Sequence, residues 1–213
     1  MNKMKKDRKN LLAFTQVSLL LAIEIIVCFT PLGTLPALGP LSATLSHIPV
    51  IITAVLLGGK AGAFMGFAFG ACSFIYWSFV SPGVFSFIYT PLFSTGIFKG
   101  NFFSILICFL PRILIGPASV LFKKIADGTK LPETVSAFAG GIAGSLTNTV
   151  LVLSGIYLFF GEQYLSATGN TGKGLLSLLL VTVATNGLPE ALLGGVAAAF
   201  IAVPVKKAIQ KLK

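Results

Sequence analysis

The placement of charged residues constrains the fold of this chain more than any other feature of its sequence. Long apolar runs alternate with short connections, and nearly all charges lie at the chain ends or in those connections. Charged residues make up only 10% of the 213 residues, whereas a soluble domain carries about 25%. So few charges cannot cover a water-facing surface. The sequence therefore excludes an ordinary soluble domain, a disordered chain and a fibre, and it indicates a helical membrane protein.

Six apolar runs are candidate transmembrane helices, since a span needs about 20 mainly apolar residues. They cover residues 11–30, 43–59, 61–80, 102–122, 134–160 and 175–204. We expect an all-α integral membrane protein whose residues 11–204 form one six-helix domain, with residues 1–10 and 205–213 as basic cytoplasmic tails. The first run is expected to be a retained helix, because it is longer than the apolar part of a signal peptide and lacks a small-residue cleavage site.

The basic residues predict the orientation of these spans. With the N-terminus in the cytoplasm, 13 of the 16 basic residues fall on the cytoplasmic side, in the two tails, at Lys60 and within 123–133. Only Lys99 and Lys173 fall outside, and Arg112 lies within a span. Both termini of this multi-pass protein are therefore expected on the cytoplasmic side of the cell membrane. The net charge of +10 is an orientation signal, and no nucleic-acid partner is expected.

Residues 81–101 form the most unusual of the predicted outer connections, which also include residues 31–42 and 161–174. Prolines and glycines interrupt this segment, yet it is rich in aromatic residues. A long apolar loop is poorly accommodated in water, so we expect it to form a lid or to re-enter the protein. An aromatic belt at the membrane surface is the alternative.

Small residues recur at intervals of four in two of the predicted spans. Gly58, Gly62, Gly66 and Gly70 form one smooth stripe, for which we expect packing inside the chain, with a contact to another subunit as the alternative. Ser18 and Ala22 form a similar pair on the first span. This pair offers a face that another membrane subunit could contact.

Polar side chains inside a membrane are costly unless they face a partner or a cavity. Arg112 lies near the middle of the fourth span, where its planar guanidinium suits a ligand carboxylate. A structural ion pair with Glu24 or Glu190 is the alternative. Asn186 and Glu190 are four residues apart on one face of the sixth span, with Pro189 between them.

Two further polar residues extend this set. Asn148 lies in a polar stretch of the fifth span and, with Asn186 and Glu190, offers hydrogen-bonding groups to a small molecule. Hydrogen bonding between helices is the alternative for these three residues. His47, near the outer end of the second span, either contacts a ligand or packs between helices.

The sequence also lacks the motifs of several functional classes. It contains no P-loop, no HExxH or GxSxG motif and no paired metal carboxylates, so neither ATP binding nor enzyme activity is expected. Its three cysteines have no CxxC spacing, so no zinc site or disulfide framework is expected. We expect no metal and no cofactor.

Four segments resemble the substrate-binding S component of energy-coupling factor (ECF) vitamin transporters. They are LGPLSATLSHIPVIITAVLLGGKAGAFMGFAFG, PRILIG, TNT and NGLPEALLGG. The resemblance extends through nearly the whole chain and is greatest to the pantothenate-specific branch. It implies capture of a vitamin from outside the cell, followed by toppling within the membrane when a transmembrane coupling subunit engages the first helix. Two cytosolic ATPase subunits would drive this cycle.

The resemblance also implies roles for individual residues. The family docks through two alanines four residues apart on the first helix, and here Ser18 replaces the first while Ala22 is the second. For pantothenate, Arg112 is expected to bind the carboxylate. The remaining ligand contacts are expected from Asn148, Asn186, Glu190 and His47, with Trp77 and Tyr89 covering the gem-dimethyl group.

Other functions remain compatible with the sequence. The chain could be an S component for another vitamin, such as riboflavin, niacin or folate. It could instead be an oligomeric ion-coupled carrier or channel, or an accessory membrane protein without a ligand. Binding of a vitamin by the purified chain alone separates the S components from the other two classes.

Overall fold

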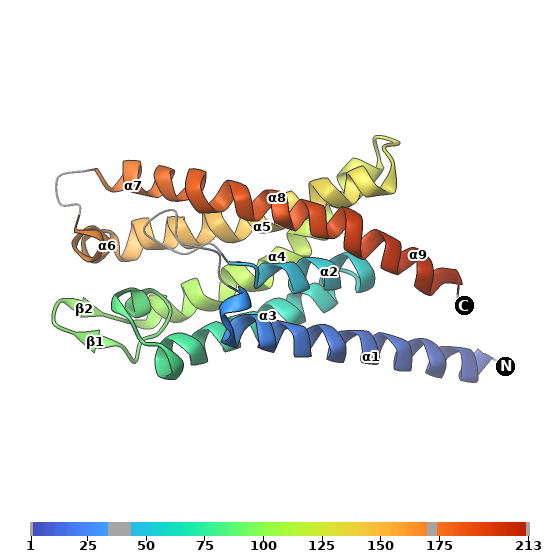
Figure 1. Ribbon diagram of the computed structural model, residues 1–213, viewed down its shortest axis with the longest axis horizontal. Coiled ribbons are helices and arrows are strands. Elements are labelled where there is room, and N and C mark those ends of the chain that lie inside the picture. The colour runs from blue at the N-terminus through green and yellow to red at the C-terminus, as the bar shows by residue number, and fades with distance from the viewer. Residues whose placement is uncertain (1, 34–43, 170–173, 212–213) are drawn as a thin grey trace.

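The computed structural model describes residues 2–33, 44–169 and 174–211, and this part of the chain is mostly helical. The long helices lie side by side along one axis (Figure 1). Both chain ends lie at one end of the molecule, whereas the small β-hairpin and α6 lie at the other. Most of the predicted 31–42 connection, together with Lys173 and Lys213, falls outside the described residues.

Five of the six predicted spans correspond to helices that are long and apolar enough to cross a membrane. Four of these spans contain one long α-helix each: α1 (Asn2–Phe29), α3 (Gly59–Ile75), α4 (Phe102–Asp127) and α5 (Glu133–Phe159). The helix α3 continues into the π-helical turn η2 (Tyr76–Val80). The fifth consists of α7 (Leu175–Thr182), η4 (Val183–Gly187), α8 (Leu188–Ala197), η5 (Ala198–Ala202) and α9 (Val203–Lys211).

The predicted second span contains a much shorter helix. The helix α2 (His47–Leu57) has 11 residues and is therefore about 16 Å long, well below the ~30 Å of a bilayer core. Its residues His47 and Pro49–Val55 are all buried by other parts of the chain. A helix that is largely enclosed by other helices can be apolar on all its faces without spanning a membrane. Six spans and the orientation of the termini therefore stay predictions.

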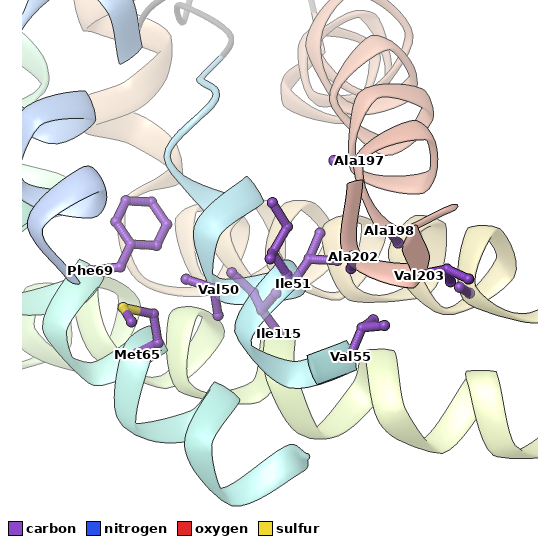
Figure 2. Close-up of a cluster of buried hydrophobic side chains, with 12 residues drawn as sticks. Val50, Ile51, Val55, Met65, Phe69, Ile115, Ala197, Ala198, Ala202 and Val203 are labelled. Atoms are coloured by element: carbon purple, nitrogen blue, oxygen red, sulfur yellow. The ribbon is translucent and has the colours of Figure 1, made fainter. Parts of the chain in front are cut away.

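The helix α2 forms the centre of one hydrophobic core. Figure 2 shows Val50, Ile51 and Val55 of α2 between side chains of α3 and α4 and those of the C-terminal passage, which is the helical segment Leu175–Lys211 from α7 to α9. The neighbouring side chains are Met65, Phe69, Ile115, Ala197, Ala198, Ala202 and Val203. Close van der Waals packing of this kind stabilises helical membrane proteins, because burial from lipid alone supplies little driving force.

The glycine stripe mostly packs inside the chain, as predicted. Three of its members, Gly62, Gly66 and Gly70, face α4. A Cβ on Gly62 would lie 2.8 Å from Gly116 Cα, and one on Gly66 would lie 2.1 Å from the carbonyl oxygen of Arg112. Gly58 differs, since it has a φ of 96° and no atom within 4 Å of such a Cβ. It forms the turn between α2 and α3 and is not part of the packed stripe.

The middle of the 81–101 segment, residues 86–90, is buried against the helices, as expected of a lid or re-entrant segment, whereas much of the rest is exposed. They contain the 3-10 helix η3 (Val84–Ile88) and the antiparallel strands β1 (Ser94–Thr95) and β2 (Phe98–Lys99), with Ser94 opposite Lys99. Phe87 and Ile88 are fully buried, and the Phe87 ring lies 5.5 Å from that of Phe160. The helix α6 (Gly161–Thr168) adds Tyr164, whose ring lies 5.9 Å from that of Phe85. One further 3-10 turn, η1 (Pro31–Gly33), follows α1.

Candidate functional site

A cavity of about 760 Å³ lies among the helices, on the side of η2 and η3. Residues of α1, α3, α4, α5 and α8 contribute to its wall, which is largely apolar and aromatic with a few polar groups. Small-molecule sites have this character and a volume of roughly 300–1,000 Å³. Six of the seven predicted ligand residues line the cavity: Trp77, Tyr89, Arg112, Asn148, Asn186 and Glu190.

Arg112 contributes a positive charge to the wall of this cavity, and only 6% of the residue is exposed. Its Nη1 donates a hydrogen bond to the carbonyl oxygen of Ile107 at 2.5 Å. Its Cζ lies 5.0 Å from the centre of the Tyr89 ring and 5.5 Å from that of Phe69. The buried Nε–H has no partner among the described residues. A buried charged donor without a partner is costly, so this position favours an anionic ligand.

The described residues do not form the alternative arrangement, a structural ion pair of Arg112 with Glu24 or Glu190. They contain two ion pairs, Lys123–Asp127 and Lys206–Glu133, each with a distance of 2.8 Å. Neither involves Arg112. Glu24 is fully buried and accepts a hydrogen bond from the Cys28 thiol at 3.1 Å. Within the described part of the chain, the Arg112 guanidinium therefore lacks a carboxylate in ion-pair contact.

Glu190 connects α8 to the backbone that precedes α2. One carboxyl oxygen, Oε1, accepts a hydrogen bond from the backbone N–H of Thr44 at 2.6 Å. The backbone carbonyl of Glu190 lies 3.1 Å from Nε2 of His47. The bond from Thr44 holds the Glu190 side chain in the cavity wall, and among the described residues the second carboxyl oxygen accepts no hydrogen bond.

His47 lies behind the cavity and does not form part of its wall. It is 1% exposed and packs under α8, where a Cβ on Gly194 would lie 3.4 Å from its Nε2. The helix-packing interpretation of His47 therefore describes its position better than direct ligand contact. His47 is buried because other parts of the chain cover most of α2, which the sequence did not reveal.

Asn186 lies in the π-helical turn η4, shortly before Pro189. Proline cannot donate to the carbonyl four residues earlier, and a wider turn accommodates that loss. The Thr185 hydroxyl lies 2.9 Å from both Asn186 Oδ1 and the carbonyl oxygen of Val181, so these two acceptors share its single proton. The wide turn places the Asn186 amide in the wall.

Three further predicted residues, Asn148, Trp77 and Tyr89, also line the cavity. Asn148 of α5 has a buried Oδ1 without a partner among the described residues. Trp77 stacks on Tyr89 with ring centroids 5.4 Å apart and an angle of 27° between the rings. Because Arg112 also lies over the Tyr89 ring, the three side chains form one continuous aromatic and cationic surface.

Several cavity residues were not predicted from the sequence, although they lie at helical spacing from residues that were. Thr182 lies one turn before Asn186, which lies one turn before Glu190, and all three line the cavity. Phe69 and Ser73 lie two turns and one turn before Trp77 and also line it. One step of four residues back from Asn186 reaches Thr182, and two such steps back from Trp77 reach Ser73 and Phe69. The same step from Arg112 reaches Cys108, which does not line the cavity, so helical spacing identifies only some of the wall residues. Residues 27–30, at and just after the end of α1, carry no such signal.

Known proteins with a similar sequence or structure were found in three comparisons. The family model described as "ECF transporter, substrate-specific component" matches residues 12–205. The pantothenic acid transporter PanT of Lactococcus lactis subsp. cremoris (strain MG1363) is 37% identical over 155 residues, which cover 72% of each protein. A solved S-component for biotin from an ECF-type ABC transporter has a TM-score of 0.48 and 17% identity, over 95% of this chain and 93% of that one.

Proposed function

The chain belongs to the substrate-specific components of ECF transporters, and from this membership we propose that it captures pantothenate outside the cell for import. The observation that carries the choice of ligand is Arg112, whose buried guanidinium lines the cavity with its Nε–H unpartnered among the described residues. The identity of 37% to a pantothenic acid transporter supports the same ligand.

Arg112 binds the pantothenate carboxylate. A guanidinium can donate two parallel hydrogen bonds to a carboxylate, and such charge-assisted pairs are strong. The largely apolar wall of the cavity lowers the local dielectric and strengthens the pair further. The aromatic rings of Phe69 and Tyr89 hold the guanidinium in place while the ligand binds.

The rest of the wall recognises the hydroxyl, amide and gem-dimethyl groups. Glu190 already accepts one hydrogen bond through Oε1, so its second oxygen suits a ligand hydroxyl. Asn186 and the unpartnered Oδ1 of Asn148 serve the second hydroxyl and the amide. Trp77 and Tyr89 cover the gem-dimethyl group. His47 supports Glu190 from behind.

Energy for import comes from partner subunits, since the sequence has no P-loop of its own. A transmembrane coupling subunit contacts Ser18 and Ala22, both of which are exposed on α1. Glu24 is the only buried residue among the described side chains of α1, so the outer face of that helix is available. Two cytosolic ATPases then drive toppling of the loaded protein toward the cytoplasm.

Isothermal titration calorimetry on the purified chain, without partner subunits, tests the ligand. We expect pantothenate to bind with a stoichiometry of one and riboflavin, which has no carboxylate, to produce no heat of binding. Native mass spectrometry of the purified protein should show the same small molecule retained. Tight riboflavin binding without pantothenate binding would refute the choice of ligand, while the membership in the transporter family would stand.

A further inference from the structure

Pro111 lies in the middle of α4, directly before Arg112. Proline has no backbone N–H, so the carbonyl group four residues earlier, that of Ile107, loses its helical donor. Ile107 is 2% exposed, and a carbonyl group left unpaired at such a position is costly. The structure supplies a donor from a side chain, because Arg112 Nη1 lies 2.5 Å from the Ile107 oxygen.

This contact determines which edge of the guanidinium is left for a ligand. Nη1 is the nitrogen on the same side as Cδ, whereas the Nε–H points to the side of Nη2. Engagement of Nη1 therefore leaves the edge formed by Nε and Nη2, and that edge can bind a carboxylate through two parallel hydrogen bonds. The Nε–H on that edge has no partner among the described residues.

We infer that Pro111 is a positioning residue, which frees the Ile107 carbonyl to hold the Arg112 guanidinium with its Nε–Nη2 edge ready for an anion. The inference rests on the proposed role of Arg112 as the ligand anchor. A side chain that is already ordered loses less entropy on binding, and a long flexible side chain otherwise makes binding weaker. With an N–H restored at position 111, the backbone competes for the Ile107 oxygen and the guanidinium loses this anchor.

The same helix offers a matched control. Pro117 also lies inside α4, and its missing N–H frees the carbonyl of Ile113. Pro117 does not line the cavity, and Arg112 makes no hydrogen bond to Ile113. Pro111→Ala and Pro117→Ala each restore one backbone donor in α4, but only the first affects the carbonyl that holds Arg112. Thermal unfolding of both variants in detergent checks that each remains folded.

Binding of two ligands separates positioning from a general effect on the cavity. Pantothenate is compared with its neutral alcohol analogue, in which a hydroxymethyl group replaces the carboxylate. Pro111→Ala should weaken pantothenate binding by about tenfold and leave the neutral analogue unchanged, because only the carboxylate uses the ordered guanidinium. Pro117→Ala should change neither affinity. Equal losses for both ligands, or an equal loss in both proline variants, would overturn the inference.

A second measurement needs no ligand. The chain contains two arginines, Arg8 and Arg112, so nitrogen-15 labelling of arginine gives two sets of guanidinium signals, and Arg8→Lys assigns them. Wild type and Pro117→Ala should show separate Nη signals for Arg112, because the contact with Ile107 slows rotation of the guanidinium. Pro111→Ala should show averaged signals. Separate signals in Pro111→Ala would overturn the inference. If wild type binds no pantothenate, the proposed function fails, whereas this spectrum still decides the role of Pro111.

Discussion

Replacing Gly66 by alanine should displace the segment of α4 that carries Arg112. A Cβ on Gly66 would lie 2.1 Å from the carbonyl oxygen of Arg112, 2.7 Å from its carbonyl carbon and 2.9 Å from Ile113 Cα. All three atoms belong to the backbone, so no side-chain rotation can relieve the overlap. Ordinary contacts of a Cβ begin at 3.4 Å, so α4 must retreat from α3 by at least about 1 Å.

Two quantities should change as a result. Overpacking of this kind costs about 1–3 kcal/mol, so the melting temperature of the purified protein should fall. The displacement also moves the guanidinium relative to Asn186 and Glu190 across the cavity. Loss of one of the two hydrogen bonds to the carboxylate costs about 1.5–3 kcal/mol, which corresponds to roughly 10- to 150-fold weaker pantothenate binding.

The control lies on the same helix. A Cβ on Gly59 would have its nearest neighbour, Pro117 Cα, at 3.6 Å, which is an ordinary contact. Gly59→Ala should therefore leave the melting temperature and the affinity from calorimetry close to wild type. If Gly66→Ala also leaves both quantities unchanged, the close approach of α3 and α4 at Arg112 is refuted. Equal losses in both variants would show that any alanine on this face of α3 is harmful.

Three further predictions concern the ligand, the partner and the topology. Arg112→Ala should weaken pantothenate binding by roughly 30- to several-thousand-fold, since losing one side of a buried charged pair costs about 2–5 kcal/mol. Arg112→Lys should also weaken pantothenate binding, because an ammonium cannot donate two parallel hydrogen bonds. Calorimetry that finds either variant equal to wild type would contradict the role of Arg112 as the carboxylate anchor. Ser18→Leu and Ala22→Leu should lower pantothenate uptake by cells and leave binding to the purified chain intact, whereas equal loss of both would place these residues in internal packing. In a variant without its natural cysteines, Asp127→Cys and Gly169→Cys should be labelled from opposite sides of the membrane; labelling from the same side would remove the six-span topology.

The sequence predicted most helices correctly because long apolar runs have few structural interpretations. The helices α1, α3, α4, α5 and the C-terminal passage all lie within or around the predicted spans. The second span is not settled in this way, because α2 within it has 11 residues, most of which are buried by other parts of the chain. Composition alone cannot distinguish such burial from contact with lipid, so the second transmembrane span stays a prediction.

The charged and amide residues of the cavity wall could be found from the sequence, because such residues are conspicuous in an apolar run. Arg112, Asn148, Asn186 and Glu190 were recognised in this way, and all four line one cavity. Apolar wall residues such as Phe69 carry no comparable signal, since a phenylalanine facing a ligand looks the same as one facing lipid. Their positions follow only after the polar residues have fixed which helix face is turned inward.

Four polar residues within apolar runs have different surroundings in the structure. Arg112 and Asn148 each have a polar atom without a partner among the described residues, and both line the cavity, so a ligand can supply the missing hydrogen bonds. Glu24 and His47 also have such atoms, but neither lines the cavity. A polar residue in an apolar run therefore identifies a group that needs a partner, whereas the surrounding helices decide whether that partner can be a ligand. For Arg112 the decisive neighbour is Pro111, because the helical carbonyl group that it leaves free holds one nitrogen of the guanidinium and leaves the opposite edge for an anion.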